Sequence, residues 1–276
     1  MKQEQTTLGI IAGGGALPRA LIASCHRQKR PVFVLALKGQ AVPDLLKETK
    51  GVSVRLGEIG KAVRLLKKEG ARDIVFIGNV RRPSVREIWP DLKTLCMLCR
   101  VGFRMQGDDS LLRIILSEAE HLGFRVVGID TLMPELLAHE GIYGKVKPSR
   151  ADQADIKQGI NVAKTLGRVD VGQAVIVQRG LVLAVEGIEG TAALIKRTAT
   201  LKRKGSGGVL VKVAKPQQDR RVDLPTVGPA TVQAVFDAGL KGIAVESGAT
   251  LLAESEKMIK LADRLGIFVT GVSCKS

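Results

Sequence analysis

The sequence is poor in the residues that most often mark a binding site for nucleic acid. Aromatic residues make up only 3% of the 276 positions, and they are scattered along the chain. Because single-stranded nucleic acid is held largely by stacking on aromatic rings, this scarcity argues against a nucleic-acid binder. No zinc-finger, helix-turn-helix or RNA-recognition signature occurs either. We therefore expect no nucleic-acid partner.

Metal-binding cysteine and histidine clusters are also lacking. The chain has four cysteines and three histidines. Cys96 and Cys99 form a single CxxC within residues 95–100, a pattern that predicts an amphipathic helix. A zinc site needs two more ligands, and no second cluster of cysteine or histidine exists. We therefore expect free thiols in a reducing cytosol.

Long apolar runs are absent as well. No stretch reaches the roughly 18 consecutive apolar residues of a membrane-spanning helix. The residues after Met1 include no hydrophobic signal core. We expect a cytoplasmic protein, or one that rests on a membrane surface.

Positive charge is abundant. Lys and Arg total 43 against 27 Asp and Glu, a formal net charge of +16, while 45% of residues are hydrophobic, enough for a real core. Such a surface attracts anions, either phosphorylated ligands or an anionic membrane.

Strand and helix patterns alternate along the first half of the chain. We predict strands at 8–12, 32–37, 52–56, 74–78 and 125–129, and helices at 16–28, 60–70 and 108–123. This alternation is typical of a parallel sheet covered on both faces. We therefore predict an α/β fold with a Rossmann-like N-terminal domain over residues 1–138.

The second half predicts a distinct C-terminal α/β domain over residues 149–276. Residues 139–148 hold two glycines and a proline, and we predict an interdomain linker there. Ser149 is expected to cap a helix that ends near residue 166. Strands are expected at 173–178, 181–185, 209–213, 243–245 and 268–272, and further helices at 190–200, 229–238 and 255–265. The first two strands would form a hairpin through Arg179 and Gly180, although arginine is not ideal there.

A glycine turn between the first strand and helix has the outline of a nucleotide-binding turn. Gly13, Gly14 and Gly15 would let the backbone approach a diphosphate at a helix N-terminus. The dinucleotide fingerprint is incomplete, because Pro18 replaces its third glycine and Lys38 stands where an acid would bind a ribose. The turn either binds a nucleotide other than NAD or is only a tight turn.

Residues 215–228 form a stiff, densely charged loop between a strand and a helix. Lys215, Arg220 and Arg221 could neutralise a diphosphate. Asp219 or Asp223 could hold Mg²⁺ or act as a general base. The alternative is a solvated loop whose charges pair with one another. Nearby, Glu186 and Glu189 could assist metal or ligand binding, or Thr191 could simply cap the next helix.

Four motifs, in this order, resemble one family. They are Gly-Gly-Gly-Ala-Leu-Pro at 13–18, Gly-Asp-Asp-Ser-Leu-Leu at 107–112, Val-Leu-Ala-Val-Glu-Gly-Ile-Glu-Gly-Thr at 182–191 and Gln-Asp-Arg-Arg-Val-Asp-Leu-Pro-Thr-Val-Gly at 218–228. Together they resemble the LpxI-type UDP-2,3-diacylglucosamine pyrophosphatases of lipid A biosynthesis, over about residues 8–272. The last motif is the most specific.

The resemblance implies Mg²⁺-dependent hydrolysis of UDP-2,3-diacylglucosamine to UMP and 2,3-diacylglucosamine 1-phosphate, with water attacking the phosphorus on the sugar side. Asp223 matches the family's key aspartate and is expected to be catalytic and a metal ligand, with Asp219 as second choice. Where family members often have aspartate this chain has Ala192; if that aspartate assists the metal, another acid, for example Glu189, would have to substitute. The expected substrate-binding residues are Gly13, Gly14, Gly15, Glu189, Gly190, Thr191, Lys215, Arg220 and Arg221.

The resemblance also gives the positive charge a use. A lipid-linked substrate would draw the protein to the inner membrane as a peripheral protein, with Lys202, Arg203 and Lys204 docking on anionic lipid. A homodimer is suggested by the family alone. Two alternatives stay open, namely a dehydrogenase-like NAD enzyme and a non-catalytic protein that binds a nucleotide or lipid.

Overall fold

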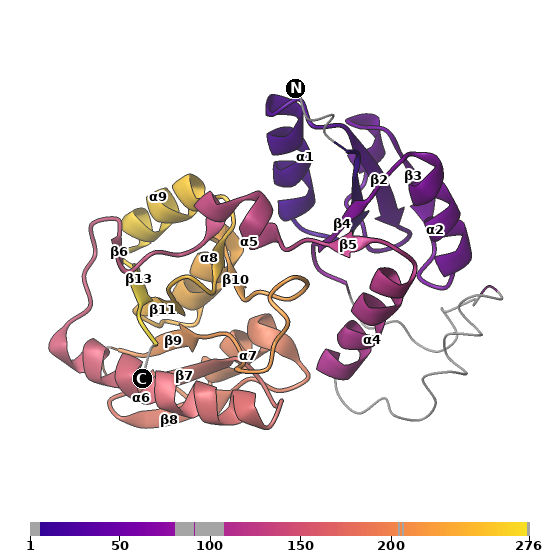
Figure 1. Cartoon of the computed structure of the whole chain (residues 1–276). Helices are drawn as coiled ribbons and strands as arrows, with labels where there is room; N and C mark the ends of the chain where they lie inside the picture. The colour runs from indigo at the N-terminus through magenta and orange to yellow at the C-terminus, as the bar shows by residue number, and fades with distance from the viewer. Residues whose placement is uncertain (1–5, 81–90, 92–107, 204, 206, 275–276) are drawn as a thin grey trace. The chain divides into compact units, whose positions relative to one another are not determined.

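The computed structural model describes residues 6–80, 91, 108–203, 205 and 207–274. The chain divides into two compact units, Met1–Pro134 and Glu135–Ser276, each built from strands and helices (Figure 1). The CxxC of Cys96 and Cys99 lies outside the described residues. Among the helices that are described, none is both long enough and apolar enough to cross a bilayer.

The first unit is a parallel five-stranded sheet with helices on both faces. Its strands run in the order β3-β2-β1-β4-β5, and every neighbouring pair is parallel. Figure 1 shows α1 on one side of the sheet and α2 and α4 on the other. This strand order is that of the Rossmann fold, so the predicted fold of this unit is confirmed. The strands are β1 (Leu8–Ala12), β2 (Val32–Leu37), β3 (Gly51–Val54), β4 (Asp73–Ile77) and β5 (Arg125–Val126); the helices are α1 (Leu17–Arg27), η1 (Leu45–Lys47), α2 (Ile59–Lys68), α4 (Asp108–His121) and α5 (Ile129–Leu132), and η3 (Pro134–Leu136) runs into the second unit.

The second unit is a mixed six-stranded sheet in the order β6-β13-β11-β9-β7-β8. Its centre, β9, β11 and β13, is parallel, and the outer strands are antiparallel to their neighbours. Two short strands, β10 and β12, form a separate parallel pair. The strands are β6 (Gly141–Tyr143), β7 (Ala174–Gln178), β8 (Leu181–Val185), β9 (Val209–Lys212), β10 (Thr226–Val227), β11 (Gly242–Glu246), β12 (Leu251–Leu252) and β13 (Phe268–Val272); the helices are α6 (Arg150–Arg168), α7 (Gly190–Thr198), α8 (Pro229–Asp237) and α9 (Ser255–Leu265).

Alternate side chains of the central strands fill two separate cores. Ile176, Leu210 and Ile243 point to the face covered by α7, α8 and α9. Their neighbours Val175 and Val211 point to the opposite face, which α6 covers. Because both faces are covered, the central strands consist of nearly continuous apolar residues.

The segment predicted as a linker, residues 139–148, is instead part of the second unit. β6 pairs with β13, and Tyr143 is only 6% exposed. The Tyr143 hydroxyl lies 2.8 Å from Nδ1 of His139 and accepts a hydrogen bond from the His139 backbone N–H. A strand of three residues has too little periodicity to be recognised, so the glycines and proline led to a wrong prediction.

The predicted hairpin between β7 and β8 is confirmed, and the structure explains its arginine. Arg179 and Gly180 have φ angles of 50° and 75°, as a tight two-residue hairpin turn requires. The carboxylate of Asp155 on α6 accepts hydrogen bonds from both backbone N–H groups, at 2.8 and 2.7 Å. Asp155, only 3% exposed, thus holds the turn in this conformation.

Candidate active site at the carboxyl edge of the second sheet

The carboxyl ends of the parallel strands β9, β11 and β13 meet at one edge of the second sheet. Ligands of open α/β sheets bind outside this edge. β9 ends at Lys212 and β11 ends at Glu246. The charged loop singled out in the sequence leaves β9 here, so the fold places it where a ligand site is expected.

An ion pair fixes the start of this loop. Lys164 on α6 contacts both carboxylate oxygens of Glu246 at 2.7 Å. The same carboxylate accepts a hydrogen bond from the Ala214 backbone N–H at 2.8 Å, and Lys164 donates to the Ala214 carbonyl at 3.2 Å. The chain therefore leaves the strand in one defined direction.

Asp223 is held by Gln218 of the same loop. The Gln218 side chain is 8% exposed, and its amide nitrogen donates to the Asp223 carboxylate. Its amide oxygen accepts from the Lys215 backbone N–H at 3.2 Å. The Asp223 backbone N–H also donates to the Asp219 carbonyl, at 3.2 Å. The Asp223 carboxylate is therefore oriented by a hydrogen bond from a neutral amide of the same loop.

A buried lysine ends the strand from which this loop leaves. Lys212, the last residue of β9, is 8% exposed, and its ammonium donates to the Thr226 carbonyl at 3.1 Å. Burial lowers the pKa of Lys212, and the negative charges of Glu186 and Asp223 partly offset that effect. In the sheet, Lys212 pairs with Ala174, whose carbonyl accepts a hydrogen bond from the Glu186 N–H, and Thr226 is three residues from Asp223. Lys212, Glu186 and Asp223 therefore gather at one edge of the sheet, and we call them the acid–lysine cluster.

Glu186 joins the acid–lysine cluster from the loop that follows β8. It is 6% exposed and accepts hydrogen bonds from the Gln173 backbone N–H at 3.0 Å and from the Thr191 hydroxyl at 2.6 Å. Thr191 does not cap α7, because the cap residue is Glu189 and no side-chain cap bond is present. The capping alternative for Thr191 is therefore wrong, and its hydroxyl orients Glu186 instead.

The other charged residues predicted for the site already have partners. Arg221 binds the Asp219 carboxylate with a closest distance of 2.7 Å, and Lys215 pairs with Asp170 at 2.5 Å. Arg220 donates to the Gly248 carbonyl at 2.5 Å. Exposed Glu189 pairs with Arg197 at 2.8 Å, and this hydrogen-bonded guanidinium lowers the pKa of the carboxyl group. Binding of a phosphate by these cations would require an exchange of partners.

The glycine turn of the first unit is tied to the sheet at two of its three glycines. The Gly13 and Gly14 backbone N–H groups donate to the carbonyls of Ile77 and Asn79, both at 2.8 Å. A Cβ at Gly13 would lie 2.5 Å from the Asn79 oxygen, so glycine is required there for packing. Gly15 is exposed and has a φ angle of 90°. A ligand at this turn would therefore meet Gly15 and the first N–H groups of α1.

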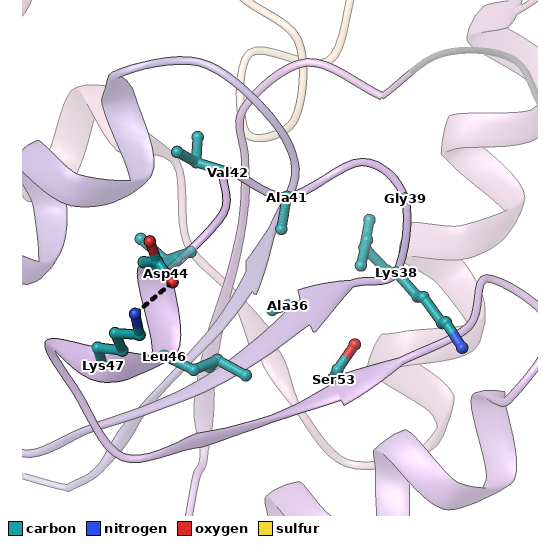
Figure 2. A pocket seen from close by; sticks show the side chains of 11 residues that line it. Ala36, Lys38, Gly39, Ala41, Val42, Asp44, Leu46, Lys47 and Ser53 are labelled. Carbon is teal, nitrogen blue, oxygen red and sulfur yellow. Dashed lines mark ion pairs between the residues drawn. The ribbon is translucent and has the colours of Figure 1, made fainter.

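A cavity of about 410 Å³ opens beside this turn, at the carboxyl end of β2. Ala36, Ala41 and Val42 give it an apolar lining, and Figure 2 shows Lys38 at its edge. The ion pair between Asp44 and Lys47, at 2.8 Å, lies at another side of it (Figure 2). The glycine turn lies close to this cavity. A Cβ at Gly14 would lie 2.9 Å from the carbonyl oxygen of Gln40, whose neighbours Gly39 and Ala41 line the cavity.

The described part of the chain contains no group of three or more His, Cys, Asp or Glu side chains that could hold a metal ion. A magnesium ion that is bound together with phosphates needs only one or two protein carboxylates. Glu186 and Asp223, whose carboxylates accept hydrogen bonds only from neutral groups in the described structure, match that number of ligands. Their hard oxygen atoms are the donors that Mg²⁺ prefers.

Lys212 is the residue of this site that the sequence did not reveal to us. The run Val209-Leu-Val-Lys-Val213 predicts a buried strand that includes the lysine. A lysine inside an apolar strand is itself a signal, because a buried ammonium requires compensating charge or hydrogen bonds.

Comparison with solved structures gives only weak similarity. The biotin carboxylase domain of a Hydrogenobacter thermophilus 2-oxoglutarate carboxylase is 11% identical with a TM-score of 0.28, covering 72% of this chain and 42% of that one. The biotin carboxylase subunit of a pyruvate carboxylase is 12% identical with a TM-score of 0.25, covering 70% and 40%. The chain thus spans less than half of either protein, and TM-scores this low carry no information about function.

Family models and a relative match far more closely. Residues 7–136 match the LpxI N-terminal domain and residues 139–270 match the LpxI C-terminal domain. The UDP-2,3-diacylglucosamine pyrophosphatase LpxI of Caulobacter vibrioides is 43% identical over 272 residues, which cover 96% of this chain and 97% of the relative. With both domains matched in order and a relative this similar along nearly its whole length, the chain belongs to the LpxI family.

Proposed function

We propose that this chain hydrolyses the diphosphate of UDP-2,3-diacylglucosamine and releases UMP and 2,3-diacylglucosamine 1-phosphate. The observation that carries the proposal is the 43% identity, across almost the full length, to a protein named for this activity. The acid–lysine cluster adds a chemical rationale, because it places two carboxylates and an ammonium at the edge of the sheet where ligands bind.

Asp223 is the proposed catalytic residue, as a general base for water or as a ligand of the metal. Asp219 is the second candidate, but its carboxylate accepts hydrogen bonds from Arg221 and is less available to water. In the first unit we propose that the substrate contacts the glycine turn at Gly15, while Gly13 and Gly14 hold the turn against the sheet. In the second unit we propose contacts with Glu189, Gly190, Thr191, Lys215, Arg220 and Arg221.

Mg²⁺ is the proposed cofactor, and the charge of the cluster supports it. With Lys212 protonated, the two carboxylates exceed the ammonium by one negative charge. A diphosphate is itself negative, so a divalent cation would favour its approach to the cluster. Glu186 and Asp223 would hold the ion together with phosphate oxygens, and a bound Mg²⁺ would polarise the phosphoryl group.

The proposed place of action is an anionic membrane surface in the cytoplasm, because the substrate carries acyl chains. The net charge of +16 favours such a surface. Lys202 and Arg203 begin the basic loop proposed to contact it, whereas Lys204 lies outside the described residues.

The test is release of UMP from UDP-2,3-diacylglucosamine by the purified full chain with Mg²⁺. We expect turnover that EDTA abolishes and added Mg²⁺ restores. Well-folded protein that releases no UMP would contradict the proposal. Reduction of NAD by the same protein would favour the dehydrogenase alternative, and substrate binding without turnover would favour the non-catalytic one.

The position of water attack can be read in the same assay. In ¹⁸O-labelled water we expect the label in the sugar 1-phosphate, because the proposed attack is on the phosphorus next to the sugar. Mass spectrometry of both products measures this. Label in UMP would place the attack on the other phosphorus and leave the overall reaction unchanged.

A further inference from the structure

Lys212 occupies an unusual place for a charged residue. It follows Val209, Leu210 and Val211, each of which is 0% exposed, and it is itself 8% exposed. A buried ammonium destabilises the fold unless hydrogen bonds or opposite charges compensate it. Packing in the sheet does not explain a lysine at this position, because an apolar side chain would pack there without this penalty.

The compensation comes from two different loops. The one hydrogen bond of the Lys212 ammonium within the described structure goes to the Thr226 carbonyl, at 3.1 Å. The opposite charges are Glu186, from the loop after β8, and Asp223, from the loop after β9. Lys212 pairs with Ala174 of β7, whose carbonyl accepts a hydrogen bond from the Glu186 N–H at 2.8 Å, so Lys212 and Glu186 flank β7 at the same level of the sheet. Asp223 lies three residues before Thr226, the hydrogen-bond partner of Lys212. Neutral groups orient both carboxylates, namely the Gln173 N–H and Thr191 hydroxyl for Glu186 and the Gln218 amide for Asp223. Lys212 is thus the cation that connects the two loops electrostatically.

We propose that Lys212 is a positioning residue of the diphosphate site, which acts through Glu186 and Asp223 by competing with a divalent cation for their negative charge. Without substrate, the fixed ammonium keeps the two carboxylates in place and weakens their binding of a cation. The phosphates of the substrate then supply the additional oxygen ligands that make cation binding favourable. The inference rests on the proposed function, because the diphosphate is the anion that completes the site.

This role predicts two opposite effects of removing the ammonium. In Lys212→Met, the carboxylates lose their competing cation, so the substrate-free protein should bind Mn²⁺ about 10-fold more tightly. Turnover should nevertheless fall about 10- to 100-fold, as is typical when a group that orients ligating residues is removed. A lysine that only stabilises the fold would not increase metal affinity.

The experiment uses the full chain and two independent measurements. Mn²⁺ binding without substrate is followed by electron paramagnetic resonance, and UMP release is followed with Mg²⁺. Lys241→Met is the matched control, because Lys241 is exposed and precedes β11 at the opposite, amino-terminal edge of the sheet. Lys212→Gln, which can still donate to Thr226, is measured in parallel in case the methionine variant does not fold.

Tighter Mn²⁺ binding together with slower turnover in a folded Lys212 variant, with neither change in Lys241→Met, supports the proposal. Glu186→Gln combined with Lys212→Met should then show a smaller gain in affinity than Lys212→Met alone. A folded variant with unchanged or weaker Mn²⁺ binding overturns it, whatever its turnover. If the wild-type protein releases no UMP, the proposed function fails, while the Mn²⁺ comparison still decides whether Lys212 competes with a cation.

Discussion

At the scale of single residues, the two aspartates of the charged loop have different surroundings. Asp223 accepts a hydrogen bond from the neutral Gln218 amide, whereas Asp219 is bound by the Arg221 guanidinium. We expect Asp223→Asn to reduce UMP release by at least about 100-fold, the range for loss of a general base. Asp219→Asn should have a much smaller effect on kcat.

The comparison needs both variants folded, which circular dichroism and a melting curve establish. Equal losses in the two variants would contradict the distinction, and wild-type turnover in Asp223→Asn would remove the catalytic assignment. A loss confined to KM in Asp219→Asn would indicate that Arg221 contacts the substrate.

Asp73 in the first unit predicts a pH-dependent contribution to stability. It is 5% exposed and binds Arg125 and Arg30, with closest distances of 2.7 and 2.8 Å. The hydrogen-bonded Arg125 guanidinium is the largest cause of the lowered pKa of Asp73. Because the folded-state pKa is lowered, this stabilisation is fully present above the unfolded-state pKa of about 3.9 and is lost as the pH falls below it.

Asp73→Asn should therefore lower the free energy of unfolding at pH 7 by about 1.5–3 kcal/mol, the range for hydrogen bonds to charged groups. Urea unfolding from pH 7 to pH 3 measures the difference, which should shrink below about pH 4. Glu48→Gln is the control, because the pair of Glu48 with Arg19 is exposed, and we expect a change below about 1 kcal/mol. A difference that is independent of pH would contradict the electrostatic explanation.

At the scale of helices and strands, long apolar runs could be predicted from the sequence and short paired strands could not. The predicted bounds of β1, β2, α9 and β13 match the structure, because the apolar pattern of each element can be recognised within its own residues. β6, β10 and β12 have two or three residues each, and their partners lie far away in the sequence. The predicted strand at 125–129 ends at Val126, and α5 begins at Ile129.

Some residues of the candidate site could likewise be predicted from the sequence, and others could not. The charged loop and Glu186 could be singled out by composition, and Asp223 by the motif that contains it. The proximity of Lys212 to these carboxylates depends on the order of the strands in the sheet. The local sequence does not reveal that order. The pairings of Lys215 with Asp170 and of Glu189 with Arg197 could not be predicted either, because charged residues were available in many combinations.

The hairpin of β7 and β8 gives a prediction at this scale. Asp155→Ala removes the acceptor for the Arg179 and Gly180 N–H groups, which are left to water in a turn with positive φ angles. We expect the free energy of unfolding to fall by about 1–3 kcal/mol, measured by urea denaturation. Asp237→Ala is the control, because exposed Asp237 interacts only with Gln233 in the described structure, and its effect should stay within about 0.5 kcal/mol. Equal effects of the two variants would contradict the role of Asp155.

At the scale of the whole molecule, the excess of positive charge predicts salt-dependent association with membranes. Vesicles that contain anionic lipid should bind the protein at low salt and release it as the ionic strength rises. Replacing Lys202, Arg203 and Lys204 by glutamine should weaken binding by about 3 kcal/mol, at about 1 kcal/mol for each residue. Sedimentation with vesicles measures this, and vesicles of neutral lipid are the control. Unchanged association of the triple variant would exclude this loop.

The place of β13 in its sheet has a consequence for the order in which the chain can fold during synthesis. The strands of the first unit all lie between residues 8 and 126, so that sheet can be complete while the rest is still being made. In the second unit β13 lies between β6 and β11, although it comes last in sequence among the described strands. Until residue 272 has left the ribosome, β6 has no partner and β11 exposes an open edge. A nascent chain that stalls before this point therefore holds a finished first unit and an unfinished, aggregation-prone second one.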